Sequence, residues 1–210
     1  MGRVGILALW VGILAGVSHA ASTTVASQPA PPPKRLISVQ DSPGYQPLHD
    51  PDSLADQLGR RPSAALVSTS FTGGARSLEA LGRAICGALH TDAPDSMLKL
   101  CLTPGEFRVI LWPEFPQSRP ATGLVWTDAW QVLNGRLVGG STAFARDFGG
   151  HVYTFIAFER TAATKVYKNF KLHNGVVLVA KDDEGKTHRF PFIRSIAERK
   201  GRFKIYSMTD

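Results

Sequence analysis

The chain has 210 residues, a formal net charge of +7 at pH 7 and only two cysteines. A folded part of about 140 residues can bury a core without staples, which excludes a small fold that depends on disulfides. The sequence also lacks a phosphate-binding glycine loop and a dinucleotide-binding fingerprint, and we expect no cofactor.

The first 20 residues have the three-part pattern of a secretory signal peptide. Arg3 supplies the positive charge, and an apolar run over 4–17 precedes the small residues Ser18 and Ala20, so we expect cleavage after Ala20. The run of about fourteen residues is shorter than the roughly 20 that span a bilayer, and an uncleaved anchor is the alternative. We therefore expect an exported protein, periplasmic or extracellular, with no transmembrane segment after cleavage.

The next segments carry little that would build a core. Residues 21–35 are small, polar and rich in proline, which predicts a disordered, extended tether. Residues 36–74 remain rich in proline, glycine and aspartate, with short apolar islands, and predict an irregular lead-in segment. The folded domain is therefore expected over residues 75–210.

Three helices are expected at the start of that domain. Ser77 is positioned to cap a helix over 78–89, where apolar residues recur at steps of three and four. A second helix begins near Pro94, which suits a first turn, and continues to about residue 102. Thr103–Glu106 has the capping-box pattern that begins a short third helix.

A longer fourth helix is expected over 126–148, where apolar side chains again recur at steps of three and four. Three glycines interrupt this stretch: Gly135, Gly139 and Gly140. Each weakens a helix by roughly 1 kcal/mol relative to alanine, so we expect close packing against another element to compensate.

After residue 150 the apolar pattern changes to the alternation of β-strands. Five strands are expected, separated by turns that contain glycine. They cover residues 151–159, 164–172, 176–181, 188–198 and 202–208. Helices followed by an antiparallel meander predict an α+β domain, with the helices packed on one face of the sheet.

This order of elements resembles the nuclear transport factor 2-like superfamily, also called ketosteroid isomerase-like. Two local strings, over 103–114 and 192–204, look like those of exported bacterial members of unknown function. The resemblance implies a cone in which a curved antiparallel sheet and the helices enclose an apolar pocket. The superfamily spans isomerases, dehydratases, binding modules and subunit-interface domains, so the fold does not fix the function.

Three patterns of reactive residues are incomplete. Gly139–Ala143 matches a nucleophile elbow but continues a helical stripe. Cys86 followed by the strand residue His151 has the order of a thiol peptidase, but no helix N-terminus lowers the pKa of a mid-helix thiol. The histidines have no ligand spacing, so we expect no metal site, and His173 is expected to be solvated or bonded to backbone.

A pocket between the long helix and the first strand is the expected binding site. Alternation puts His151, Tyr153 and Phe155 on one face of that strand, and the helix contributes Trp126 and Trp130. Catalysis of the ketosteroid isomerase type would need a carboxylate base in the pocket. No strand has an obvious inward Asp or Glu, so no catalytic residue is assigned and enzyme activity stays open.

The two cysteines, Cys86 and Cys101, are expected on consecutive helices. An even number of cysteines in an exported chain favours a disulfide between them, and two separate buried thiols are the alternative.

Three functions stay open. The favoured one is an exported, non-catalytic domain that binds a small apolar ligand or a protein partner. The second is an isomerase- or hydratase-type enzyme that uses the same pocket. The third follows from residues 159–210, which hold 12 Lys and Arg against 6 Asp and Glu. Such basic strands would bind an anionic cell-envelope polymer, with nucleic acid a less expected partner, or would only keep the sheet soluble.

Overall fold

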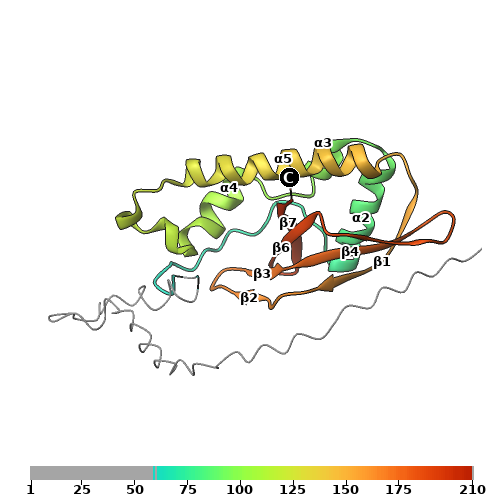
Figure 1. Ribbon diagram of the computed structural model, residues 1–210. Helices are drawn as coiled ribbons and strands as arrows, with labels where there is room; N and C mark the ends of the chain where they lie inside the picture. Colours follow the sequence, from blue (N-terminus) through green and yellow to red (C-terminus); the bar gives the residue numbers. More distant parts are fainter. Residues whose placement is uncertain (1–58, 60, 210) are drawn as a thin grey trace, which may run out of the picture. The chain divides into compact units, whose positions relative to one another are not determined.

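Helices and two antiparallel sheets make up an α+β fold, in agreement with the fold class predicted from the sequence (Figure 1). The structure is a computed structural model that describes residues 59 and 61–209. The predicted signal peptide (1–20), the tether (21–35) and most of the lead-in segment (36–74) lie outside the described residues. Within the described part, no helix is long and apolar enough to cross a membrane.

The first helices follow from local signals in the sequence. Ser77 caps α2 (Leu78–His90), because its side chain accepts a hydrogen bond from the backbone N–H of Ala80 at 3.0 Å. α3 (Pro94–Leu98) begins at the predicted proline but ends earlier than expected. α4 (Pro104–Glu106) begins with the predicted capping box.

Four short helical turns connect α4 to the long helix. They are the π-helical turn η2 (Phe107–Leu111) and the 3₁₀ turns η3 (Trp112–Glu114), η4 (Pro116–Ser118) and η5 (Pro120–Thr122). Each 3₁₀ turn has a proline in one of its first two positions, where the missing N–H breaks no helical hydrogen bond. A proline inside a longer helix would break such a bond, so each proline marks the start of a new turn. A π-helical turn often marks a functional site.

α5 (Trp126–Phe148) is the longest helix and passes over the end of β7 (Figure 1). A Cβ atom on Gly140 would lie 2.6 Å from the Cβ of Met208 and 2.7 Å from the carbonyl oxygen of Thr209. The close packing expected for the helix glycines is therefore confirmed at Gly140, because only a glycine lets the helix approach the strand this far. Gly135, in contrast, faces open space.

All pairs of neighbouring strands are antiparallel. One sheet has the order β1 (Tyr153–Arg160), β4 (Val176–Asp182), β5 (Thr187–Phe190). The other has the order β2 (Lys165–Val166), β3 (Lys171–Asn174), β6 (Ile193–Arg199), β7 (Arg202–Met208).

The structure has seven strands in place of the expected five, because two of the expected strands are each interrupted and form two shorter strands. The predicted strand over 164–172 breaks at a turn over 167–170, which is closed by a hydrogen bond from the N–H of Tyr167 to the carbonyl of Phe170 at 2.9 Å. The predicted strand over 188–198 breaks at Pro191, which has no N–H to continue a ladder. The chain passes from one sheet to the other at this proline, so a single meander is not formed.

A buried ion pair joins α4 to β7. Lys204 is 2% exposed, and its Nζ donates to both carboxylate oxygens of Glu106 at 2.9 and 3.0 Å. The same oxygens accept the backbone N–H groups of Thr72 at 2.6 Å and Thr103 at 2.8 Å. The carboxylate is therefore fully compensated by charge and by hydrogen bonds, as a buried charge requires.

We expect Lys204→Met to lower the free energy of unfolding by about 3–5 kcal/mol, because it leaves the Glu106 carboxylate buried without its cation. The double variant Glu106→Gln/Lys204→Met should recover part of this loss. Urea unfolding followed by circular dichroism measures both. Arg83→Met breaks the exposed pair with Glu79 and should cost less than about 1 kcal/mol. A Lys204→Met loss no larger than this control would contradict the role of the pair.

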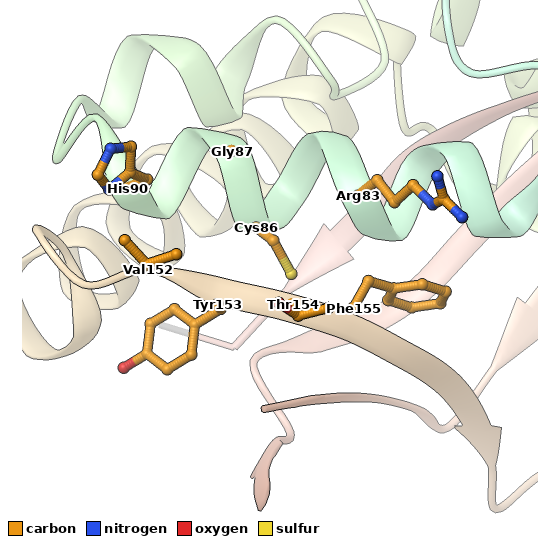
Figure 2. A pocket seen from close by; sticks show the side chains of 8 residues that line it. All are labelled: Arg83, Cys86, Gly87, His90, Val152, Tyr153, Thr154 and Phe155. Atoms are coloured by element: carbon orange, nitrogen blue, oxygen red, sulfur yellow. The ribbon is translucent and has the colours of Figure 1, made fainter. Parts of the chain in front are cut away.

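The two cysteines are free thiols, so the expected disulfide is wrong. Cys86 points from α2 toward β1 (Figure 2). Cys101 lies beyond the end of α3 and forms a parallel β-bridge with Ile205 of β7. The pairing assumed a second helix that would still be helical at residue 101, and α3 ends at Leu98. Burial raises the pKa of Cys86 to about 11 and that of Cys101 to about 12.

Both thiols should resist alkylation in the native protein, because the thiolate is the reactive form and neither thiol ionises near neutral pH. After denaturation without reductant, the protein should take up two carbamidomethyl groups from iodoacetamide, as measured by intact mass. If the denatured protein takes up these groups only after reduction, the two cysteines form a disulfide and the free-thiol assignment is wrong.

Candidate functional site

An aromatic pocket of about 410 Å³ opens between the short helical turns, the start of α5 and strands β2, β3 and β7. Its lining residues are Gly59, Phe107, Trp112, Phe115, Pro116, Gln117, Leu124, Ala129, Lys165, Tyr167, Leu172 and Tyr206. None of these lining residues is acidic, and Lys165 is the one cation among them.

A buried carboxylate holds one wall of the aromatic pocket in place. Glu114 is 1% exposed, and its two oxygens accept the backbone N–H groups of Lys168 and Asn169 at 2.5 and 2.6 Å. These bonds fix the turn over 167–170 against η3. Glu114 does not line the pocket, and both of its oxygens are occupied by backbone donors, so its role is structural.

Phe115 makes the largest set of ring contacts at this wall. Its ring centroid lies 5.6 Å from that of Tyr167, 5.9 Å from Phe170 and 6.1 Å from Tyr206. Phe107 packs against it at 6.3 Å, and Tyr167 stacks on Phe170 at 4.3 Å. Rings at these separations make edge-to-face and stacked contacts, which give the pocket a fixed apolar wall.

Two tyrosine hydroxyls add hydrogen-bonding groups to this wall. Burial raises the pKa of Tyr206 to about 12, and the nearby Tyr167 adds to the rise. Burial, together with the charge of Glu114, also raises the pKa of Tyr167. Both hydroxyls are therefore protonated at neutral pH. In the part of the chain that the structure describes, neither has a hydrogen-bond partner, so each is free to donate to a bound molecule.

The predicted binding residues Trp126 and Trp130 lie at the start of α5, beside this pocket but outside its lining. The ring of Trp130 packs on Phe107 at 5.6 Å. The guanidinium carbon of Arg108 lies 5.2 Å from the ring centroid of Trp126, within the range of a cation–π contact. Trp130 thus supports the lining through Phe107, and Trp126 contacts Arg108, which is not a lining residue.

The other predicted residues lie at a second cavity, of about 520 Å³, between α2 and β1 (Figure 2). Tyr153 and Phe155 line it, and His151 does not, although its ring centroid is 6.2 Å from that of Tyr153. Phe155 packs against the backbone of Gly82, where a Cβ would lie 2.2 Å from the ring. The two cavities share no lining residue, so the structure does not bring the two predicted groups together.

Sequence reasoning missed Phe115, Tyr167 and Tyr206. Phe115 lies between the predicted third and fourth helices, where no element was predicted, and the two tyrosines lie within predicted strands, where an aromatic residue needs no further explanation. The available signal was the cluster of aromatic residues over 107–115, which turns alone do not require.

A polar line of side chains joins β3 to β6. The buried His173 contacts Glu198 through Nε2 at 2.8 Å and Thr164 Oγ1 through Nδ1 at 3.0 Å. Lys171 donates to the other oxygen of Glu198 at 3.1 Å. The expectation of a solvated or backbone-bonded His173 is therefore wrong. Hydroxyl, imidazole and carboxylate are the parts of a hydrolase triad, but none of these residues lines the aromatic pocket.

The surroundings of Ser141 and Cys86 do not suit either residue to act as a nucleophile. Ser141 is fully buried within α5 and donates to the sulfur of Met208 at 3.4 Å, so its glycine-rich string is not a nucleophile elbow. The raised pKa of Cys86 opposes formation of a reactive thiolate. Among the described residues, no group of three or more His, Cys, Asp or Glu side chains is placed to hold a metal ion.

Comparison of the chain with known protein families, curated proteins and solved structures found no match. The resemblance to the nuclear transport factor 2-like superfamily therefore stays a prediction.

We expect Glu198→Gln to destabilise the protein at neutral pH but not in acid. Burial raises the pKa of Glu198, but hydrogen bonds from His173 and Lys171 outweigh it and hold this pKa below its ordinary value. A carboxyl with a lowered folded-state pKa stabilises the fold above its unfolded pKa, and this contribution disappears as the pH falls through the folded value. Thermal unfolding at a series of pH values should therefore show the variant and wild type converging as the pH falls through the lowered pKa of Glu198.

The control for this experiment is Glu79→Gln, which changes an exposed carboxylate on α2. Its difference from wild type should be small at neutral pH, as for other exposed ion pairs. A Glu198→Gln effect of the same size at every pH would show that the loss comes from packing and not from ionisation.

Proposed function

We propose that this domain binds a small, largely apolar molecule with a planar ring in the aromatic pocket and performs no chemistry on it. The observation that carries the proposal is a cavity lined by aromatic rings, among them Tyr167 and Tyr206, whose hydroxyls are protonated and have no hydrogen-bond partner among the described residues. The rings give apolar contact area, and the hydroxyls orient the ligand through hydrogen bonds. Export from the cytoplasm and a cone-like enclosure of the pocket are part of this proposal.

An isomerase or hydratase that uses the same pocket has less support. Such an enzyme needs a carboxylate or another base within hydrogen-bond reach of its substrate. The lining of the aromatic pocket contains no carboxylate, and the nearby Glu114 is held by two backbone donors. The tyrosines, with raised pKa values, are suited to donating hydrogen bonds and not to removing protons.

A module that binds an anionic polymer through its basic strands also has less support. Lys204 is buried in an ion pair, and the buried Arg199 donates to backbone carbonyls. Lys168 and Lys200 donate to the carbonyls of Ala64 and Ser68, each at 2.8 Å. Several cations that make residues 159–210 basic thus serve the fold, which lowers the charge available to a polymer.

The proposal is tested with 2-naphthol, a planar apolar probe that carries one hydroxyl, in isothermal titration calorimetry. Tyr206→Phe should weaken binding about tenfold, because it removes one hydrogen bond and keeps the ring. Ala129→Trp should abolish binding, because it places an indole in the cavity.

The matched control is Tyr153→Phe, which makes the same change at the cavity between α2 and β1 and should leave the affinity unchanged. The proposal is wrong if neither 2-naphthol nor indole binds saturably to the wild type. It is also wrong if Tyr153→Phe weakens binding as much as Tyr206→Phe does.

A further inference from the structure

A third cavity, the polar pocket, lies where the start of β6, the end of β7 and the turn between β3 and β4 come together. Its volume is about 490 Å³. The lining residues are Thr161, Asn174, Gly175, Val176, Val177, Pro191, Ile193, Arg194, Ser195, Tyr206, Ser207 and Thr209. Arg194 is the one charged residue among them, so the lining has positive charge and no carboxylate.

Two β-bulges shape the polar pocket. Ile193 pairs with Met208 and Ser195 pairs with Ser207, which leaves Arg194 as an extra residue on β6. Ile196 then pairs with Ile205, which leaves Tyr206 as an extra residue on β7. Bulges redirect side chains and occur often beside functional sites. Here both extra residues line the cavity.

Ser195 and Ser207 form the cross-strand pair between the two bulges. They are 4% and 5% exposed. In the described part of the chain, neither hydroxyl has a hydrogen-bond partner, and both oxygens keep some exposure to solvent. Two hydroxyls that are not used within the fold can each donate a hydrogen bond to a molecule in the polar pocket.

Arg194 adds an uncompensated charge to this pair. Its side chain is exposed and has no ion pair or hydrogen bond within the described residues. Other arginines of the same sheets are engaged, as Arg189 is with Glu159 and Arg199 is with backbone carbonyls. A guanidinium that lines a cavity without a carboxylate partner is suited to bind an anion through two parallel hydrogen bonds.

We propose that the polar pocket is a binding site for an oxyanion, such as a phosphate or carboxylate group of a small molecule. The hydroxyls of Ser195 and Ser207 and the guanidinium of Arg194 donate to it. A metal ion would need carboxylate ligands, and an apolar ligand would leave the three donors unsatisfied. The site is separate from the aromatic pocket except that Tyr206 lines both cavities.

Inorganic phosphate, added to isotope-labelled protein at constant ionic strength, should shift the backbone amide resonances of Arg194, Ser195 and Ser207 saturably. Arg194→Gln should weaken binding about tenfold or more, because it removes charge-assisted hydrogen bonds. Ser195→Ala/Ser207→Ala should have a comparable effect. Arg194 is exposed, so we expect Arg194→Gln to fold. This variant therefore still tests the proposal if the double serine variant does not fold.

The matched control is Arg76→Gln, which removes an exposed cation outside the pocket and should leave the affinity unchanged. Acetate, titrated in the same way, distinguishes a carboxylate from a phosphate. Saturable binding of either ion that depends on Arg194 supports the oxyanion site. Binding of neither ion, equal binding of glucose, or an equal loss in Arg76→Gln overturns it. None of these outcomes depends on whether 2-naphthol binds the aromatic pocket.

Discussion

The aromatic pocket depends on a turn that enters the core, and the turn over 167–170 depends on buried polar partners. Its backbone N–H groups donate to Glu114, and its carbonyl at Asn169 accepts from the buried guanidinium of Arg199. A buried backbone group without a partner costs about 1–3 kcal/mol, so a turn can replace a strand here only where side chains satisfy it. The two stacked rings of this turn, which face Phe115, are positioned as a result.

The same set of side chains fixes the segment that precedes α2. Asn169 accepts the N–H of Val67 and donates to the carbonyl of Ala65, both at 2.8 Å. Arg199 donates to the carbonyl of Thr69 at 2.6 Å. An irregular segment with few apolar residues is thus held by hydrogen bonds to the sheet, although its composition predicts only a lead-in. Glu114, which precedes the lining residue Phe115, is used for this framework, and the lining itself contains no carboxylate.

The elements that could be predicted from the sequence are those whose signal is local. Both α2 and α5 follow from apolar residues that recur at the helical period. The start of α2 follows from the Ser77 cap, and the start of α5 from the first residue of its apolar stripe. The turn over 167–170 could not be predicted, because the carboxylate that satisfies it is 54 residues away in sequence. The disulfide was wrong for a related reason. Cys101 is held by a bridge to β7, and no feature near residue 101 specifies that partner.

The candidate binding residues were hard to predict because they lie where regular alternation fails. Alternation assigns each strand residue to one of two faces, and a bulge resets that assignment by one residue. Tyr206 is such an extra residue, and it lines both the aromatic and the polar pocket. Arg194, the extra residue of the facing strand, reaches the polar pocket in the same way. A sequence pattern can locate β6 and β7, but their bulges appear only in the pairing between them, and that pairing determines which side chains meet a ligand.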